Sequence, residues 1–284
     1  MKKNVLRLET SRMIIGILLT LVGLIMAQLL AITIGTLPTL IGVPKAIGNI
    51  IAGVLYPVFI LVEVKLICNK VLKLSLEKCK ISKISLRPVW CIVAVVMPLF
   101  VCLGLMLLPG QFKENVMSLS DKWTTVTGAV VFIGLGVGIA EEMVFRGVIM
   151  SVLEHRYNKV VAIIVPSVTF ALVHAIGMHY DFISIFQLLI AGSVVGILFS
   201  LVTYESGSIW NAALMHGIWN MSMIGGILNI GDSANERAIY NYVLDTNSRW
   251  ISGGDFGIEA SIISIVVYLI FIVLAGLLYK RKVK

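Results

Sequence analysis

The chain has 284 residues, of which 58% are hydrophobic and 13% are charged, and its mean hydropathy is +0.99. This apolar content is well above that of a soluble domain and excludes an ordinary water-soluble enzyme. The net charge of +8 does not indicate nucleic-acid binding, because the basic residues cluster beside apolar runs and not along a stripe with interleaved aromatic residues.

Eight apolar runs are long enough to cross a membrane as helices, which takes about 20 residues each. The runs are continuous, whereas the strands of a membrane β-barrel alternate over about ten residues. The sequence therefore predicts an all-α, polytopic helical bundle of about eight spans. In chain order the runs lie near 13–35, 46–68, 89–109, 124–150, 160–178, 183–203, 208–230 and 258–279.

We divide the chain into three parts. Residues 1–123 form an N-terminal region with three spans and a basic loop, and residues 124–230 form a core of four spans. Residues 231–284 contain an external loop and the last span. The loop 231–257 is polar and rich in Gly, Ser, Asn and Asp, so we expect it to be irregular and to act as a lid or a linker.

The basic residues predict the orientation in the membrane. Sixteen of the 23 Lys and Arg residues fall in the two terminal tails and in the loops after the second and fourth runs. By the positive-inside rule, both termini are cytoplasmic in a multi-pass protein of the cell membrane, and the clusters contact anionic membrane lipids. These residues are Lys2, Lys3, Arg7, Arg12, Lys70, Lys73, Lys78, Lys80, Lys83, Arg87, Arg156, Lys159, Lys280, Arg281, Lys282 and Lys284.

The fourth run ends in the segment AEEMVFRG, which contains Glu141, Glu142 and Arg146. Ionisable residues within spans are costly and usually mark function. Residues four apart share a helix face, while neighbours point about 100° apart. Glu142 is thus expected to pair with Arg146, which leaves Glu141 available as a general base. The alternative is that both glutamates share Arg146 and only hold helices together.

Three more polar residues lie at a similar depth on two other runs. They are His174, which ends the sequence FALVH, and His216 and Asn220, which share one helix face in HGIWN. At about 1.5 Å per residue, these three and Glu141 lie roughly 14 to 22 Å from the cytoplasmic edge. Such a set is suited to activating water and stabilising an oxyanion, as in amide hydrolysis. Either histidine alone is more simply explained as a satisfied polar residue in a helix interface.

The motifs EExxxR, FxxxH and HxxxN, in this order, resemble those of CAAX prenyl endopeptidases and bacteriocin-processing or immunity membrane proteins, the CPBP or Abi family. The resemblance covers about residues 124–230. The matching residues are Glu141, Glu142, Arg146, Phe170, His174, His216 and Asn220.

The resemblance implies an intramembrane endopeptidase, open toward the cytoplasmic side, that cleaves a membrane-associated peptide or protein that can be lipidated. In this family Glu141 would activate the water, His174 would assist it or move the proton, and His216 with Asn220 would bind the scissile carbonyl and its oxyanion. The Glu142–Arg146 pair and Phe170 would support these groups.

Three alternatives stay open at this point. The reaction needs either no cofactor or a divalent metal such as Zn²⁺, for which Glu141, His174 and His216 could be ligands, although HExxH is absent. A non-catalytic membrane partner, such as a bacteriocin self-immunity or sensor-regulating protein, could use the same polar core for binding. A small-solute transporter is disfavoured because no repeat or pair of broken helices is visible.

Overall fold

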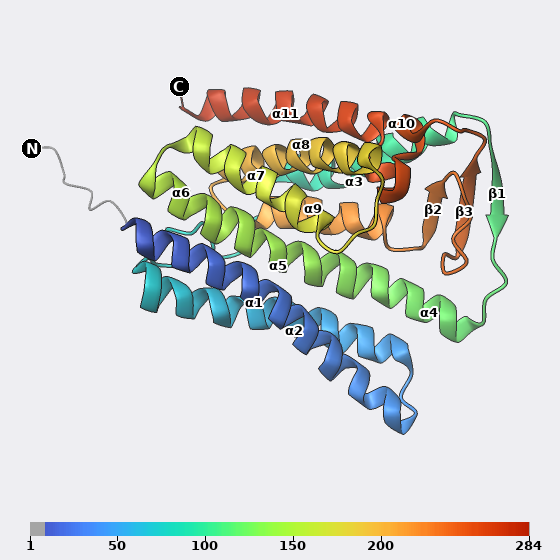
Figure 1. Cartoon of the computed structure of the whole chain (residues 1–284), viewed down its shortest axis with the longest axis horizontal. Helices are drawn as coiled ribbons and strands as arrows, with labels where there is room; N and C mark the ends of the chain where they lie inside the picture. The colour runs from blue at the N-terminus through green and yellow to red at the C-terminus, as the bar shows by residue number, and fades with distance from the viewer. Residues whose placement is uncertain (1–8, 284) are drawn as a thin grey trace, which may run out of the picture.

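The computed structural model describes residues 9–283, so Lys2, Lys3, Arg7 and Lys284 of the predicted cytoplasmic tails lie outside the described residues. Long helices pack lengthwise into a bundle, and three short strands lie at one end of it (Figure 1). The helices are α1 (Thr10–Thr36), α2 (Lys45–Ile67), α3 (Pro88–Met106), α4 (Leu119–Thr127), α5 (Gly138–Glu142), α6 (Met150–Arg156), α7 (Lys159–Ala175), α8 (Phe182–Ser206), α9 (Trp210–Met223), α10 (Arg249–Ser252) and α11 (Ile262–Val283).

Six helical segments in the described chain are long and apolar enough to cross a membrane. This confirms a helical membrane protein, but the predicted count of eight spans is not confirmed. The helix α7 has 17 residues and α9 only 14. The predicted run 208–230 is too long, because α9 ends at Met223 and Gly226 then takes a left-handed conformation with φ of 77°. The six segments are Thr10–Ile41, Lys45–Leu72, Pro88–Met106, Leu119–Arg156, Phe182–Ser206 and Ile262–Lys282.

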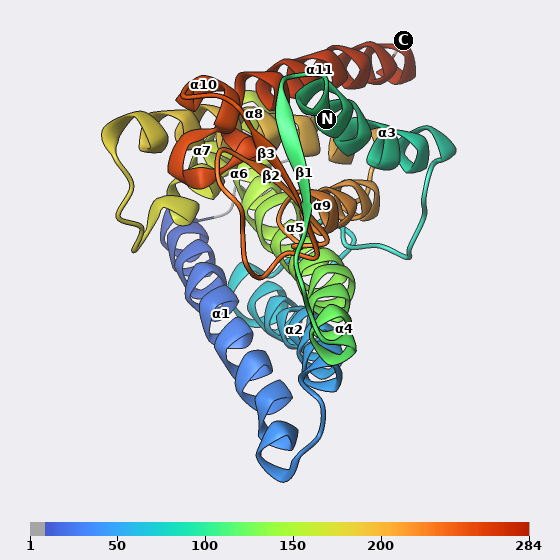
Figure 2. The ribbon, with the colours of Figure 1, turned by 90° about the vertical axis from the view of Figure 1, so that its right-hand side faces the viewer.

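A small sheet corrects the prediction of an all-α chain. Strands β1 (Gly110–Glu114), β2 (Leu228–Gly231) and β3 (Tyr240–Leu244) pair in the order β1-β3-β2. The pair β1–β3 is antiparallel and β2–β3 is parallel. Figure 2 looks onto the end of the bundle that carries these strands. The loop 231–257 is therefore partly ordered, by pairing with residues more than a hundred positions earlier in the chain.

The helical segment that carries AEEMVFRG changes pitch along its length. The helices α4, α5 and α6 are continuous with two wider π-helical segments, Gly128–Val137 and Met143–Ile149. Such turns release backbone carbonyls from the regular helix ladder and are frequent at functional sites. Here the carbonyl of Ile133 accepts a hydrogen bond from Asn220 Nδ2 at 3.4 Å.

Glycines let α9 approach this segment closely. A methyl group on Gly138 would lie 2.8 Å from the Cα of Gly217, and one on Gly217 would lie 2.8 Å from the carbonyl oxygen of Gly134. The spacing of Gly134 and Gly138 predicts such a contact, since small residues four apart let helices meet backbone to backbone. Because Gly217 follows His216, the contact holds the HGIWN motif against the glutamates.

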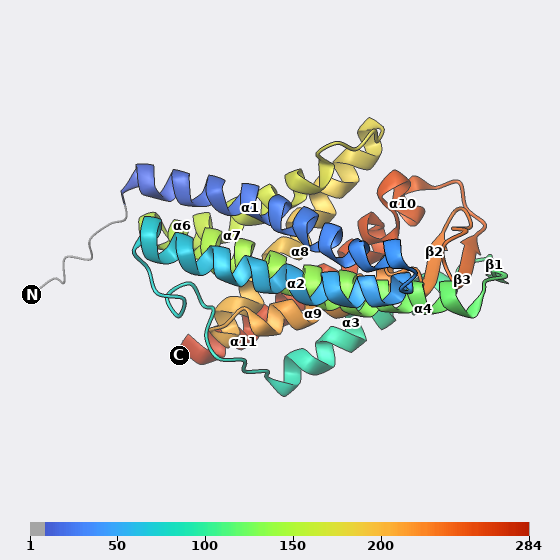
Figure 3. The same cartoon turned by 90° about the horizontal axis from the view of Figure 1, so that it is seen from below.

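The two ends of the bundle differ. The start of α1, the end of α11 and the connection 68–87 lie at one end, and the strands lie at the other (Figures 1 and 3). The connection 68–87 carries six of the basic residues. We call these two ends the basic end and the strand end.

Candidate active site in the helical core

A buried ion pair lies at the centre of the bundle. Arg146 Nη1 donates to Glu142 Oε1 at 2.7 Å, and both side chains are 0% exposed. Arg146 Nη2 also donates to the carbonyl of Gly196 at 3.2 Å. Its guanidinium carbon lies 4.8 Å from the ring centre of Phe170 and 5.3 Å from that of Phe199. The predicted pairing of Glu142 with Arg146 is thus present, with aromatic rings enclosing the cation.

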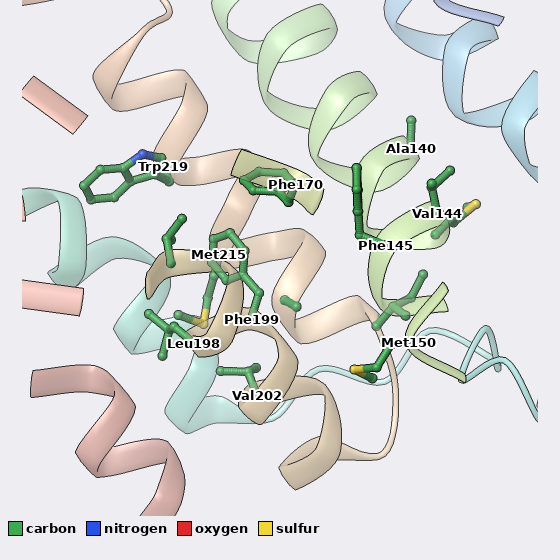
Figure 4. Packing of buried hydrophobic residues seen from close by; sticks show 14 of the residues in the cluster. Ala140, Val144, Phe145, Met150, Phe170, Leu198, Phe199, Val202, Met215 and Trp219 are labelled. Carbon is green, nitrogen blue, oxygen red and sulfur yellow. The ribbon is translucent and has the colours of Figure 1, made fainter. Parts of the chain in front are cut away.

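The aromatic enclosure comes from several helices. Phe145 follows the glutamates, Phe170 belongs to α7 and Phe199 belongs to α8, and Figure 4 shows these three rings in the packed interior. Phe145 and Phe170 meet edge to face, with ring centres 5.2 Å apart. A close-packed apolar shell of this kind fixes the rotamer of the arginine within it.

Glu142 also orients His216. The Nδ1 atom of His216 lies 3.0 Å from Glu142 Oε1. A carboxylate held by arginine accepts hydrogen bonds, so the Nδ1 of His216 is the donor here and Nε2 is free for other partners. That Nε2 atom lies 3.8 Å from Oε2 of Glu141. Glu142 therefore connects the arginine to the histidine, in addition to the supporting role that the family resemblance implies.

Glu141 forms no ion pair with Arg146 in the described structure, as helical phase predicts. Its Oε2 atom is buried and has no hydrogen-bond partner in the described chain, and the side chain is 14% exposed. A buried carboxylate oxygen without a donor is costly and unusual in a folded protein. Glu141 therefore has an unused acceptor directed toward His216.

His174 is oriented by its own helix. Its Nδ1 atom lies 2.8 Å from the carbonyl oxygen of Phe170, four residues earlier. Because a carbonyl only accepts, Nδ1 carries the proton and the lone pair of Nε2 is free. The ring centres of Phe170 and His174 are 4.5 Å apart. The FxxxH motif thus fixes both the tautomer and the ring position of this histidine.

One cavity of about 230 Å³ lies beside these groups. His174, His216, Asn220 and Phe170 line it, together with apolar residues of α8 such as Leu188. Glu141 is not among its lining residues, so the structure brings three of the four predicted catalytic residues to the cavity and places Glu141 next to His216. The arrangement offers a free carboxylate oxygen, two histidines with available Nε2 atoms and one carboxamide.

The cavity also contains a carboxylate that the sequence analysis missed. Glu259 lies in a short 3₁₀ turn (Ile258–Ala260) before α11 and lines the cavity. Its Oε1 accepts from Trp219 Nε1 at 2.7 Å. The sequence showed only an acidic residue near the start of the predicted run 258–279. An acidic residue is ordinary at the edge of a membrane span, so its position did not mark it as part of a site.

The residues proposed as conditional metal ligands do not form a ligand set. Across residues 9–283, no group of three or more His, Cys, Asp or Glu side chains is placed to hold a metal ion. Glu141 approaches His216, while His174 is directed by Phe170 in the cavity wall. The described geometry does not fit a His₂Glu centre, so we derive no step through a metal.

These features define a membrane-embedded helical protein with a buried polar site made of carboxylates, histidines and an asparagine. Residues 123–222 match the family model described as type II CAAX prenyl endopeptidase Rce1-like. The match contains all three motifs and confirms the resemblance to CAAX endopeptidases of the CPBP or Abi type. No match was found among curated proteins or among solved structures.

Proposed function

We propose that this protein is an intramembrane endopeptidase that hydrolyses a peptide bond with a water molecule activated by Glu141. One observation carries the proposal. The unpartnered Oε2 of Glu141 faces the Nε2 of His216, and the other nitrogen of this histidine is held by the buried Glu142–Arg146 pair. A free base beside an oriented histidine is the arrangement that general base catalysis requires.

The reaction follows from these positions. Glu141 accepts a proton from water, and the water oxygen bonds to the scissile carbonyl carbon, which gives a tetrahedral oxyanion. Asn220 Nδ2 donates a hydrogen bond to this oxyanion, and His216 donates a second one from Nε2 in its doubly protonated form, because Nδ1 already donates to Glu142. The carbon–nitrogen bond then breaks, and the leaving amine takes the proton from Glu141, directly or through His174. The products are a carboxylate terminus and a free amine.

The cavity supports a membrane-associated peptide or protein as the substrate, with or without a lipid group. Its apolar walls suit apolar side chains of a segment that lies in the bilayer. The family resemblance implies access from the cytoplasmic side. The lining residues that are not buried include Tyr180, Ile224 and Phe256, which belong to the strand end and not to the basic end. We therefore propose that the substrate enters from the strand end, the non-cytoplasmic side by the positive-inside rule.

A comparison of new peptide termini tests the proposal. Membranes from cells that express the wild-type protein and the Glu141→Gln variant are analysed by mass spectrometry, with Glu77→Gln as the control because Glu77 is an exposed residue outside the site. We expect termini that appear with the wild type and Glu77→Gln and are absent with Glu141→Gln. The same termini in all three samples, at equal protein levels, would show that Glu141 is not the base.

The position of Glu141 outside the cavity lining favours a second candidate, a non-catalytic membrane partner. Such a protein would use the cavity to bind a peptide or the helix of a sensor protein. It predicts that immunity or regulation survives Glu141→Gln and His174→Ala but is lost when the cavity wall changes, for example in Leu188→Trp. An endopeptidase loses function in all three variants.

A further inference from the structure

Glu259 is held in a fixed position at the strand end of the cavity. Trp219 donates to its Oε1 at 2.7 Å, and Tyr268 donates its hydroxyl to the backbone carbonyl of Glu259 at 3.2 Å. Trp219 is the neighbour of Asn220 on α9, so Glu259 is tied to the same helix that carries the HxxxN motif. The carboxylate is therefore an ordered part of the site.

This carboxylate lacks a cationic partner in the part of the chain that the structure describes. None of the ion pairs among the described residues includes Glu259. The pKa of the Glu259 carboxyl is raised, because burial outweighs the lowering by the hydrogen bond from Trp219 and by the nearby His174 and His216, and Glu141 raises it further. The charged form of a carboxyl shielded from water is costly unless a cation pairs with it. A cation that entered the cavity would provide the missing partner.

Aromatic rings surround the same part of the cavity. Tyr180, Trp219, Phe256 and Tyr268 line it together with Glu259. The ring centres of Trp219 and Tyr268 are 5.0 Å apart, and those of Tyr180 and Phe256 are 6.3 Å apart and perpendicular. The faces of aromatic rings attract ammonium and guanidinium groups, most strongly where water is excluded.

We propose that Glu259 and these four aromatic side chains form a cation-binding subsite that takes the side chain of a lysine or arginine in the substrate. That the bound lysine or arginine belongs to a substrate rests on the proposed endopeptidase function. Binding of this side chain does not itself require cleavage. The subsite lies in the same cavity as His174 and His216, so it would select peptides with a basic residue near the scissile bond.

Binding of small probes to the full chain in phosphatidylglycerol nanodiscs tests the subsite. The probes are Nα-acetyl-lysine methylamide, its neutral counterpart Nα-acetyl-norleucine methylamide, and tetramethylammonium, which represents a choline headgroup. Ligand-detected NMR titrations give each affinity. We expect the lysine probe to bind at least tenfold more tightly than the norleucine probe. Equal affinities would overturn the subsite, and tetramethylammonium as the tightest ligand would overturn its assignment to a peptide side chain.

Variants locate the binding. The Glu259→Gln side chain can still accept from Trp219, so we expect a folded protein whose affinity for the lysine probe falls at least tenfold while that for the norleucine probe is unchanged. Phe256→Leu should weaken lysine binding several-fold by removing one ring. Asp255→Asn removes a neighbouring acidic charge that does not line the cavity, and should have no effect. A loss as large in Asp255→Asn as in Glu259→Gln would contradict the proposal.

The outcomes separate the two proposals. Loss of lysine selectivity in Glu259→Gln together with unchanged cleavage in Glu141→Gln would leave the subsite standing and remove the catalytic assignment. If the wild type shows no lysine selectivity and Glu141→Gln abolishes cleavage, the catalytic assignment stands and the subsite is removed.

Discussion

Glu142 joins two functions in one side chain, because its Oε1 atom accepts from both Arg146 and His216. Arg146 supplies the positive charge that makes a buried carboxylate tolerable, and the carboxylate in turn orients the histidine next to Glu141. The pairing of Glu142 with Arg146 could be predicted, since it follows from a spacing of four residues on one helix. The contact with His216 could not, because it joins residues 74 positions apart.

Removal of the arginine alone should destabilise the protein strongly. The Arg146→Met variant leaves Glu142 buried without its cation, which we expect to lower the free energy of unfolding by about 3–5 kcal/mol. The double variant Glu142→Leu/Arg146→Met removes both charges and should regain most of this stability, but not activity, because His216 loses its acceptor. Unfolding by denaturant in detergent micelles measures both effects. Equal destabilisation of the single and double variants would contradict this explanation.

At the scale of helices, the site depends on backbone contact between α9 and the segment that carries the glutamates. Gly217 lies against Gly134 and Gly138, with no room for a side chain. The glycine spacing indicates one half of this contact in the sequence. The sheet could not be predicted in the same way, since β1 pairs with residues about 130 positions later in the chain. The end of α9 could not be predicted either. Glu259 was missed for a similar reason, because its partner Trp219 comes from another helix.

A single methyl group should separate these helices. In Gly217→Ala the new Cβ would lie 2.8 Å from a backbone oxygen, so we expect a loss of about 1–3 kcal/mol of stability and a larger fractional loss of activity, as His216 moves from Glu141. Gly276→Ala on α11 is the matched control, because nothing lies within 4 Å of its added methyl group. The control should unfold at the same or a higher denaturant concentration than the wild type. A Gly217→Ala protein as active as this control would show that the contact does not position the site.

At the scale of the whole molecule, a bundle with one basic end encloses a cavity near the opposite end. The helical membrane architecture could be predicted from apolar run lengths alone. The position of the cavity could not, because it depends on how α7, α8, α9 and the turn before α11 meet.

Labelling of introduced cysteines tests the orientation. In a cysteine-free background, Met178→Cys lies in the connection between α7 and α8, where Met178 is 50% exposed. Lys83→Cys lies in the basic connection 68–87. A membrane-impermeant maleimide added to intact cells should label Met178→Cys and leave Lys83→Cys unmodified until the cells are opened. The reverse pattern would place the cavity on the cytoplasmic side.

The most direct test of the central claim measures the cleavage rate of purified protein. Wild type, Glu141→Gln and Glu77→Gln are reconstituted at equal amounts in liposomes with a membrane peptide identified from the comparison of new termini, and release of the new amine terminus is followed over time. If Glu141 activates the water, the rate with Glu141→Gln falls by about 10² to 10⁴ and Glu77→Gln keeps the wild-type rate. A Glu141→Gln protein that cleaves at the wild-type rate would contradict the account.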